Sequence, residues 1–327
     1  MKRILTGIKP SGEFTLGNYI GAISQMKELQ DNYDSFLFIA DLHSITVKQD
    51  KKELNERIKK FIALYIACGI DPEKNTIYLQ SENPYLPAIS WLLECNTYYG
   101  EASRMIQFKE KSKENANFTV GLLTYPILMA ADILFCDSDY VPVGIDQKQH
   151  VEIARDIAER FNNTYGDTFK LPDALIKESG VKIKDLKDPS KKMSKSETNP
   201  AGVITMFDDI DLIRKKIMSA TTDSDMLIKY DVDNKPGISN LMNIASSLSN
   251  HTNDDIEKMF IGKNYGEFKR FVADIVCEEI ASVQVKYKEV YGSKLLDEVL
   301  DKGKEKSTLL AKAKYEEMCI KMGLTRK

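Results

Sequence analysis

A lysine-rich stretch in the second half of the chain has residue types and spacing that suit a polyanion. Between Lys182 and Ser196 there are six lysines and two aspartates, a local charge of +4 in a chain of net charge −3. Its centre is Lys192-Met193-Ser194-Lys195-Ser196, and Asp188-Pro189 and Asn199-Pro200 on either side predict an exposed loop. Ammonium groups between small hydroxyls fit a triphosphate. A solvated surface loop is the alternative interpretation.

A second candidate lies near the start of the chain, where a glycine-rich turn, Gly7 to Gly12, follows a predicted strand over Arg3–Thr6. Apolar residues that recur every three positions predict a helix over Leu16–Gln30. The free N–H groups and the dipole at the start of such a helix favour phosphate, and Gly17 would let a nucleotide approach the backbone. An ordinary tight turn is the alternative, and the stretch lacks the G-x-G-x-x-G pattern of dinucleotide sites.

The two stretches together resemble the two signatures of the class I aminoacyl-tRNA synthetases, and in particular those of the tryptophanyl branch. Lys-Met-Ser-Lys-Ser is the second signature of that class. Pro10-Ser11-Gly12, followed by Thr15-Leu16-Gly17-Asn18, is similar to the first signature. Thr15 and Asn18 stand where the usual form, His-Ile-Gly-His, has its two histidines, and both offer neutral hydrogen-bond donors to phosphate.

The resemblance implies ATP-dependent ligation of L-tryptophan to tRNA(Trp) through a tryptophanyl-adenylate, with release of pyrophosphate and AMP. Such a reaction needs positioning and charge stabilisation but no side-chain nucleophile. The sequence agrees, because it has three histidines and no evident Ser/His/Asp constellation. Mg²⁺ is expected to bridge the ATP phosphates with few protein ligands, and no resident metal site is expected.

The resemblance also assigns residues to the nucleotide side of the site. Lys111, in a stretch similar to the family's connecting segment, is the candidate lysine that approaches ATP, with a surface lysine as the alternative. Gly144 to Asp146 would face the ribose, and Ile183 the adenine. The expected catalytic residues are Thr15, Asn18, Lys111, Lys192 and Lys195; the expected ATP-binding residues are Lys9, Pro10, Ser11, Gly17, Asn18, Gly144, Ile145, Asp146, Ile183, Lys192, Met193, Ser194, Lys195 and Ser196.

Asp132 is a lone carboxylate in a strongly apolar predicted helix, so it needs a hydrogen-bond donor to offset its desolvation. A donor within the protein is the ordinary answer. In the tryptophanyl family this aspartate accepts the indole N–H, which can only donate. The resemblance extends the amino-acid site to Met129, Tyr125, Gln147, His43 and Val143. His43 follows a predicted strand, where either a ligand contact or a purely structural role is open.

The elements that must position these residues read as an α/β fold. Ser35–Ala40, Thr76–Gln80 and Asp139–Val143 are further predicted strands, with a helix from Leu54 to Cys68 between the first two. This β-α-β-α-β order predicts a Rossmann-like parallel sheet with helices on both faces. Residues 83–137 are predicted to be mostly helical, with Trp91 in core or interface packing.

After Ser196 the pattern predicts a smaller all-helical part, ending in a long charged helix over Leu295–Met322. The expected division is a catalytic domain over 1–187, a helical domain over 188–290 that carries the lysine loop and reads the tRNA anticodon, and a C-terminal helix over 291–327 that packs back on the catalytic domain. A homodimer through the helices of residues 83–132 is expected from the family.

Composition narrows the class of protein. Five scattered cysteines form no C-x-x-C pair, so most are expected to be buried in a reducing cytoplasm. No apolar run is long enough to span a membrane, and no secretory signal is apparent. A membrane is therefore not an expected partner. The slightly acidic net charge argues against a broad basic surface for nucleic acid, so DNA is not an expected partner and any RNA contact must come from local patches.

Three competing functions remain at this stage. A tyrosyl-tRNA synthetase has the same scaffold, and its phenol would also satisfy Asp132. A non-catalytic RNA-binding paralogue should have lost one of the two signatures, and both are intact. A nicotinamide-linked dehydrogenase would need the missing glycine fingerprint. Two departures from the family pattern, Leu5 for an aromatic residue and Lys9 for a glutamine, bear on the pocket and on the charge near ATP.

Overall fold

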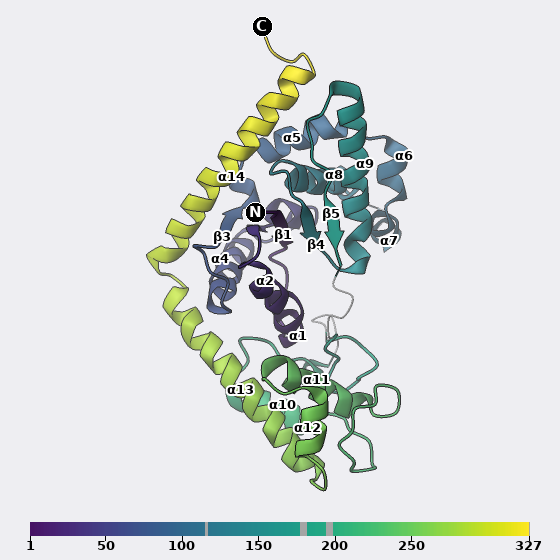
Figure 1. Ribbon diagram of the computed structural model, residues 1–327, viewed down its shortest axis with the longest axis vertical. Helices are drawn as coiled ribbons and strands as arrows, with labels where there is room; N and C mark the ends of the chain where they lie inside the picture. The colour runs from purple at the N-terminus through teal and green to yellow at the C-terminus, as the bar shows by residue number, and fades with distance from the viewer. Residues whose placement is uncertain (115–116, 177–181, 194–198, 327) are drawn as a thin grey trace.

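The computed structural model describes residues 1–114, 117–176, 182–193 and 199–326. Its centre is a five-stranded sheet in the order β3-β2-β1-β4-β5 with every pairing parallel. The fold is therefore the predicted Rossmann-like α/β sheet (Figure 1). The strands are β1 (Arg3–Ile8), β2 (Asp34–Ile39), β3 (Asn75–Leu79), β4 (Tyr140–Pro142) and β5 (Asp173–Leu175).

Strand β2 is buried on both faces of the sheet, which agrees with its nearly continuous apolar run. Alternate residues of β2 serve opposite faces: Phe36 and Phe38 pack in one cluster, and Leu37 and Ile39 in the other. The first cluster also holds α5 (Tyr85–Glu94), α6 (Tyr99–Arg104), α8 (Val120–Leu134) and α9 (Lys148–Tyr165), with α7 (Ile106–Glu114) at its edge. The second cluster holds α1 (Leu16–Asn18), η1 (Tyr19–Ile23), α2 (Ser24–Leu29) and α4 (Lys51–Ala67).

The first predicted strand continues two residues further than expected. β1 ends at Ile8 because Gly7 and Ile8 pair with Phe38 and Ile39 of β2. Gly7 suits this pairing, since an added Cβ would lie 2.5 Å from the Phe38 ring. The turn cluster therefore begins at Lys9, beyond the strand.

The predicted helix over Leu16–Gln30 is present, but its middle is a π-helical turn, η1 (Tyr19–Ile23). The helix predicted to end before Gly69 also holds: α4 ends at Ala67, and Gly69 has φ +99°, a backbone conformation that favours glycine. β5 was not predicted, because a three-residue strand leaves too short a pattern to read.

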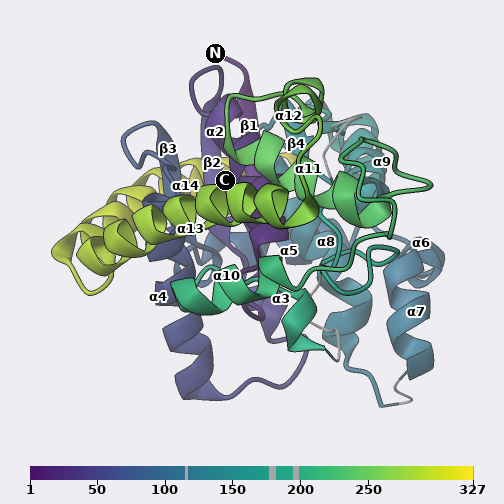
Figure 2. The same cartoon turned by 90° about the horizontal axis from the view of Figure 1, so that it is seen from below.

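Beyond residue 199 the described chain contains helices and no sheet strand, as predicted. The long helix α13 packs against α10, α11 and also α4, so it joins the helical part to the sheet (Figures 1 and 2). The helices beyond residue 199 are η4 (Pro200–Gly202), α10 (Ile210–Met218), α11 (Pro236–Leu248), α12 (Asn253–Met259), α13 (Tyr265–Val290) and α14 (Lys294–Lys321).

The last helix, α14, returns to the sheet and lies along β3 and α5, as Figure 1 shows at its left edge. The approach is close at Gly303, where an added Cβ would lie 1.8 Å from the carbonyl oxygen of Ile77. Strand β3 is the edge strand on this side, so α14 covers an edge that would otherwise be open to pairing.

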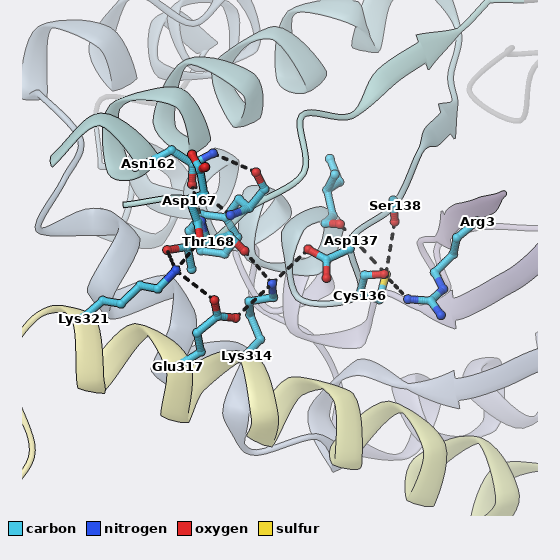
Figure 3. A network of polar contacts seen from close by, with 12 residues as sticks. Arg3, Cys136, Asp137, Ser138, Asn162, Asp167, Thr168, Lys314, Glu317 and Lys321 are labelled. Carbon is cyan, nitrogen blue, oxygen red and sulfur yellow. Dashed lines mark hydrogen bonds and ion pairs between the residues drawn. The ribbon is translucent and has the colours of Figure 1, made fainter. Parts of the chain in front are cut away.

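A polar network fixes the far end of α14 (Figure 3). The buried ammonium of Lys314 lies 2.9 Å from Asp137 Oδ1 and donates a 2.6 Å hydrogen bond to the carbonyl oxygen of Thr168. Lys321 donates to Thr168 Oγ1 at 3.0 Å and pairs with Glu317 at 3.0 Å. Since a buried cation must be paired and hydrogen-bonded, this network holds the last turns of α14 against Asp137 and Thr168.

Of the two expectations for Trp91, core packing is excluded within this chain because the residue is 64% exposed, and interface packing is the alternative that this exposure allows. The cysteines behave as predicted: Cys95 is exposed, while the other four are buried and free. Within the described ranges, no helix is long and apolar enough to cross a membrane.

Candidate active site

The turn that opens α1 is held by reciprocal hydrogen bonds between Thr15 and Asn18. The Asn18 backbone N–H donates to Thr15 Oγ1 at 3.2 Å, and the Thr15 backbone N–H donates to Asn18 Oδ1 at 3.1 Å. The Thr15 hydroxyl also donates to Asn18 Oδ1 at 2.8 Å. Thr15 is 2% exposed while Asn18 is exposed, so this capping box directs the amide nitrogen of Asn18 away from Thr15.

Both described ends of the lysine loop lie at this turn. On the N-terminal side of the loop, Ile183 and Met193 at its base pack on Gly17, where an added Cβ would lie 3.6 Å from the Cβ atom of each. After the loop, Leu16 N–H donates to the Ile204 carbonyl at 2.9 Å, and Met206 N–H donates to the Phe14 carbonyl at 2.9 Å. The two stretches that the sequence singled out are therefore adjacent.

The base of the lysine loop is a short antiparallel pairing. Lys184 and Lys192 form a β-bridge, and Met193 N–H donates to the Ile183 carbonyl at 2.9 Å. Ile183 and Met193 are buried, whereas Lys192 is exposed beside them. The predicted site residues Ser194, Lys195 and Ser196 lie outside the described residues.

Lys9 and Lys111 come from distant parts of the sequence, and the charge of Lys111 acts on Lys9. Lys9 follows β1 and is exposed as a residue, but its pKa is lowered by partial desolvation of the ammonium and by the positive charge of Lys111. The Lys111 ammonium lies 5.6 Å from the centre of the Tyr125 ring, within range of a cation–π interaction. The next turn residue, Pro10, is buried, and Ser11 is exposed with its N–H bonded to the Lys9 carbonyl at 2.8 Å.

Asp132 is fully buried and has donors within the protein. His43 Nε2 lies 2.9 Å from Asp132 Oδ2, and Gln80 Nε2 donates to Oδ1 at 2.9 Å and to Oδ2 at 2.8 Å. Burial raises the pKa of Asp132 above its ordinary value, and the hydrogen bonds from His43 and Gln80 oppose that shift. The lone carboxylate of the sequence is thus one member of a three-residue cluster.

Tyr125 links this cluster to the start of α9. Its ring meets the His43 ring edge to face at 6.1 Å between centres, and its hydroxyl lies 3.0 Å from His150 Nε2. Burial raises the pKa of Tyr125 to about 12, so the phenol is neutral at physiological pH. Met129, one turn along α8, is half-buried against the same apolar cluster as Val143.

The remaining predicted residues form a separate group at the end of β4. Gly144 precedes the short 3₁₀ turn η3 (Ile145–Gln147), and Gln147 N–H donates to the Gly144 carbonyl at 2.9 Å. Asp146 lies within this turn, and the Ile145 side chain is 68% exposed. Lys9, His43, Gln80 and Gly144 each follow one of four neighbouring parallel strands, so the groups share the carboxyl edge of the sheet, where open α/β sheets bind ligands.

Comparison with known proteins identifies the family. The family model described as tRNA synthetases class I (W and Y) matches residues 1–280. The chain belongs to this class I synthetase family. It is 48% identical over 327 residues to the tryptophan–tRNA ligase of Bacillus anthracis, covering 100% of this chain and 99% of that protein. It is 50% identical over 325 residues to the corresponding ligase of Clostridium perfringens, covering 99% of this chain and 98% of that protein.

A solved structure agrees with the class I assignment. The tryptophanyl-tRNA synthetase of Campylobacter jejuni, complexed with ADP and tryptophan, superposes with a TM-score of 0.86 at 36% identity. The match covers 98% of this chain and 99% of that one. The enzyme class and the parallel sheet with its helical C-terminal part are therefore those of class I synthetases.

Sequence reasoning missed two residues that contact the predicted site residues Asp132 and Tyr125. Gln80, which donates to Asp132, is the last residue of the strand predicted over Thr76–Gln80 and lies at the same sheet edge as His43. Its position after a strand was the available signal. His150 lies in the first turn of α9, and nothing in the sequence marked its contact with Tyr125.

Proposed function

We propose that this chain ligates L-tryptophan to tRNA(Trp) with ATP, through a tryptophanyl-adenylate. The observation that carries the proposal is the seating of the lysine-loop base on Gly17, which brings the two class I signatures together. The named relatives supply the amino acid: full-length identity of 48% to a tryptophan–tRNA ligase supports tryptophan in place of tyrosine.

In the first step the tryptophan carboxylate attacks the α-phosphorus of ATP, and the bond to the leaving pyrophosphate breaks. The protein stabilises charge on that pyrophosphate: Asn18 donates from its amide, and Lys192 and Lys195 supply ammonium groups. Thr15 acts through Asn18, because its hydroxyl is buried and donates to the Asn18 amide oxygen. In the second step the tRNA terminal ribose attacks the adenylate carbonyl, and AMP leaves.

Lys9 and Lys111 add positive charge at the same edge, and the depressed pKa of Lys9 supports their proximity. Mg²⁺ is proposed to arrive with ATP, held by phosphate oxygens and water. Among the described residues no group of three or more His, Cys, Asp or Glu side chains could hold a metal ion.

The nucleotide and amino-acid pockets are assigned to the two halves of the edge. Gly144 to Asp146 are proposed to bind the ribose, and Pro10, Ser11, Ile183 and the loop from Lys192 to Ser196 the remainder of ATP. Asp132 is proposed to accept the indole N–H. The other proposed tryptophan contacts are Met129, Tyr125, Gln147, His43 and Val143.

We retain the domain division at 187 and 290, with the anticodon read by the helical part, and propose a cytoplasmic homodimer. Trp91, Tyr98 and Tyr99 support the dimer, since they line a shallow apolar pocket and are each more than half exposed. An exposed apolar surface of this kind is typical of a protein–protein interface.

The test is amino-acid-dependent ATP–pyrophosphate exchange. Exchange with tryptophan, none with tyrosine, and charging of tRNA(Trp) are the expected results. Exchange with tyrosine alone would instead support the tyrosyl alternative, and no exchange with either amino acid would support a non-catalytic paralogue. A titration with NAD, expected to show no binding, checks the dehydrogenase alternative.

A further inference from the structure

Gln80 is fully buried in the Asp132 cluster and has no role in the reaction described above. Its amide nitrogen donates to both oxygens of Asp132, at 2.9 and 2.8 Å. Its amide oxygen is buried and has no hydrogen-bond partner among the described atoms. A buried amide oxygen without a partner is unfavourable. The side chain nevertheless keeps this orientation, and the hydrogen bonds from its amide nitrogen to Asp132 are what hold it there.

The next residue fixes the Gln80 backbone in the same way. Ser81 N–H donates to Asp41 Oδ1 at 3.0 Å, and the Ser81 hydroxyl donates to Asp41 Oδ2. Asp41 is also buried, in the short helix α3 (Asp41–Ser44) that carries His43. The turn η2 (Gln80–Glu82) therefore ties the end of β3 to one carboxylate of α3 and to one of α8.

Counting acceptor positions shows what remains for a substrate. Each carboxylate oxygen accepts about two hydrogen bonds. Asp132 Oδ2 already has two donors, His43 and Gln80, whereas Oδ1 has Gln80 alone. One acceptor position on Oδ1 is left, and its direction follows from where Gln80 holds the carboxylate.

We propose that Gln80 is a positioning residue that fixes the Asp132 carboxylate as an acceptor for the indole N–H, and so sets the preference for tryptophan over amino acids that lack this N–H. The inference rests on the proposed function. Without Gln80 the carboxylate would lose its fixed direction and one of its two donors. A protonated Asp132 would then present a donor to the indole N–H, which needs an acceptor. A rotated Asp132 would present no partner to it.

The experiment compares Gln80→Met with the parent protein in ATP–pyrophosphate exchange, using tryptophan and β-(benzothiophen-3-yl)alanine, in which sulfur replaces the N–H. For Gln80→Met we expect kcat/KM for tryptophan to fall by about 10- to 100-fold, as for a lost hydrogen bond to a charged group. We expect the value for the sulfur analogue to change by less than about threefold, and the KM for ATP likewise, because neither depends on the Asp132 acceptor.

Gln30→Met is the matched control. Gln30 accepts hydrogen bonds from Asp71 and Asn75 at the opposite end of β3, so its loss perturbs the same strand without touching Asp132. Its tryptophan-to-analogue ratio should equal that of the parent. A Gln80→Met ratio equal to that of the parent, or an equal fall in Gln30→Met, would overturn the inference.

The pH dependence of kcat/KM for tryptophan is a further measurement, and it would not change if the role of Gln80 were only structural. His43, Asp41 and Tyr78 are the titratable groups that face Asp132. Because donation from Gln80 favours the ionised carboxylate, its removal should shift the acid limb of kcat/KM for tryptophan to higher pH. An unshifted limb in an active, folded variant would count against the proposal.

If Gln80→Met fails to fold, Gln80→Leu also removes the donor to Asp132 without adding a second titratable group, and it should lose the preference in the same way. A preference retained in Gln80→Leu would contradict the proposal. If the parent protein shows no exchange with tryptophan, the proposed function itself fails; a parent that is active while the variant keeps the parent ratio defeats only the role of Gln80.

Discussion

At the scale of single residues, Thr15 and Asn18, which stand in place of two histidines, have different roles in the nucleotide turn. The buried hydroxyl of Thr15 donates to Asn18 Oδ1 at 2.8 Å and accepts the Asn18 backbone N–H at 3.2 Å. Asn18 is the exposed member of the pair. Thr15 is therefore expected to act on the reaction through the orientation of the Asn18 amide.

The variant Thr15→Val should test this expectation, because it keeps the side-chain shape and removes both hydroxyl bonds. We expect ATP–pyrophosphate exchange to slow by about tenfold, and unfolding to become easier by about 1 kcal/mol through loss of the helix cap. Thr15→Ser, which keeps the hydroxyl, should stay within about threefold of the parent rate. Equal rates for the valine variant and the parent would show that the hydroxyl has no part in catalysis.

The sequence predicted which residues follow strands, and the structure brings many of them to one edge. It could not predict the partners of Asp132, because a hydrogen bond between residues 52 and 89 positions apart depends on how helices pack on the sheet. For the same reason His43 remained open between a ligand contact and a structural role. Its bond to Asp132 places it beside the proposed indole acceptor.

At the scale of elements, long periodic segments were predicted well and short ones were not. The α4 and α14 helices agree with their predicted ranges to within about three residues. The three-residue β5 and the π turn at Tyr19–Ile23 leave no distinct pattern in the sequence. The exposure of Trp91 could not be predicted either, since an apolar helix at an interface reads like one in a core.

Gly303 tests the contact between two of these elements, α14 and β3. Gly303→Ala would place a Cβ 1.8 Å from the Ile77 carbonyl oxygen, so the helix must move off the strand. We expect the free energy of unfolding in urea to fall by about 1–3 kcal/mol, the usual range for overpacking. The control is Gly21→Ala, where an added Cβ meets nothing within 4 Å and little change is expected. Equal stability of the two variants would contradict the close packing.

At the scale of the whole molecule, Asp34 joins the first strand pair to the C-terminal helix. Arg3 Nε lies 2.9 Å from Asp34 Oδ2, and Lys306 Nζ lies 3.2 Å from Oδ1. Burial would raise the pKa of Asp34, but hydrogen bonds from Arg3 and Lys306 outweigh it and hold the pKa below its ordinary value of 3.8. One carboxylate therefore ties β1, β2 and α14 together.

A depressed carboxyl pKa stabilises the folded state above the ordinary pKa, and this stabilisation is lost as the pH falls through the folded-state value. Asp34→Asn should thus be less stable than the parent at about pH 7, and the difference in unfolding free energy should shrink as the pH falls below the ordinary value of 3.8. Urea denaturation across this range provides the measurement. A difference that does not change with pH would mean that charge at Asp34 does not hold α14.

The central claim is that the turn at Thr15–Asn18 and the lysine loop act on one triphosphate, and ATP–pyrophosphate exchange by Lys195→Ala, Asn18→Ala and the double variant tests it most directly. We predict that Lys195→Ala slows exchange by about 10²- to 10³-fold with tryptophan affinity nearly unchanged. The double variant should lose less than the product of the single effects, because both groups stabilise the same leaving pyrophosphate. Exchange by Lys195→Ala within about twofold of the parent rate would contradict the account.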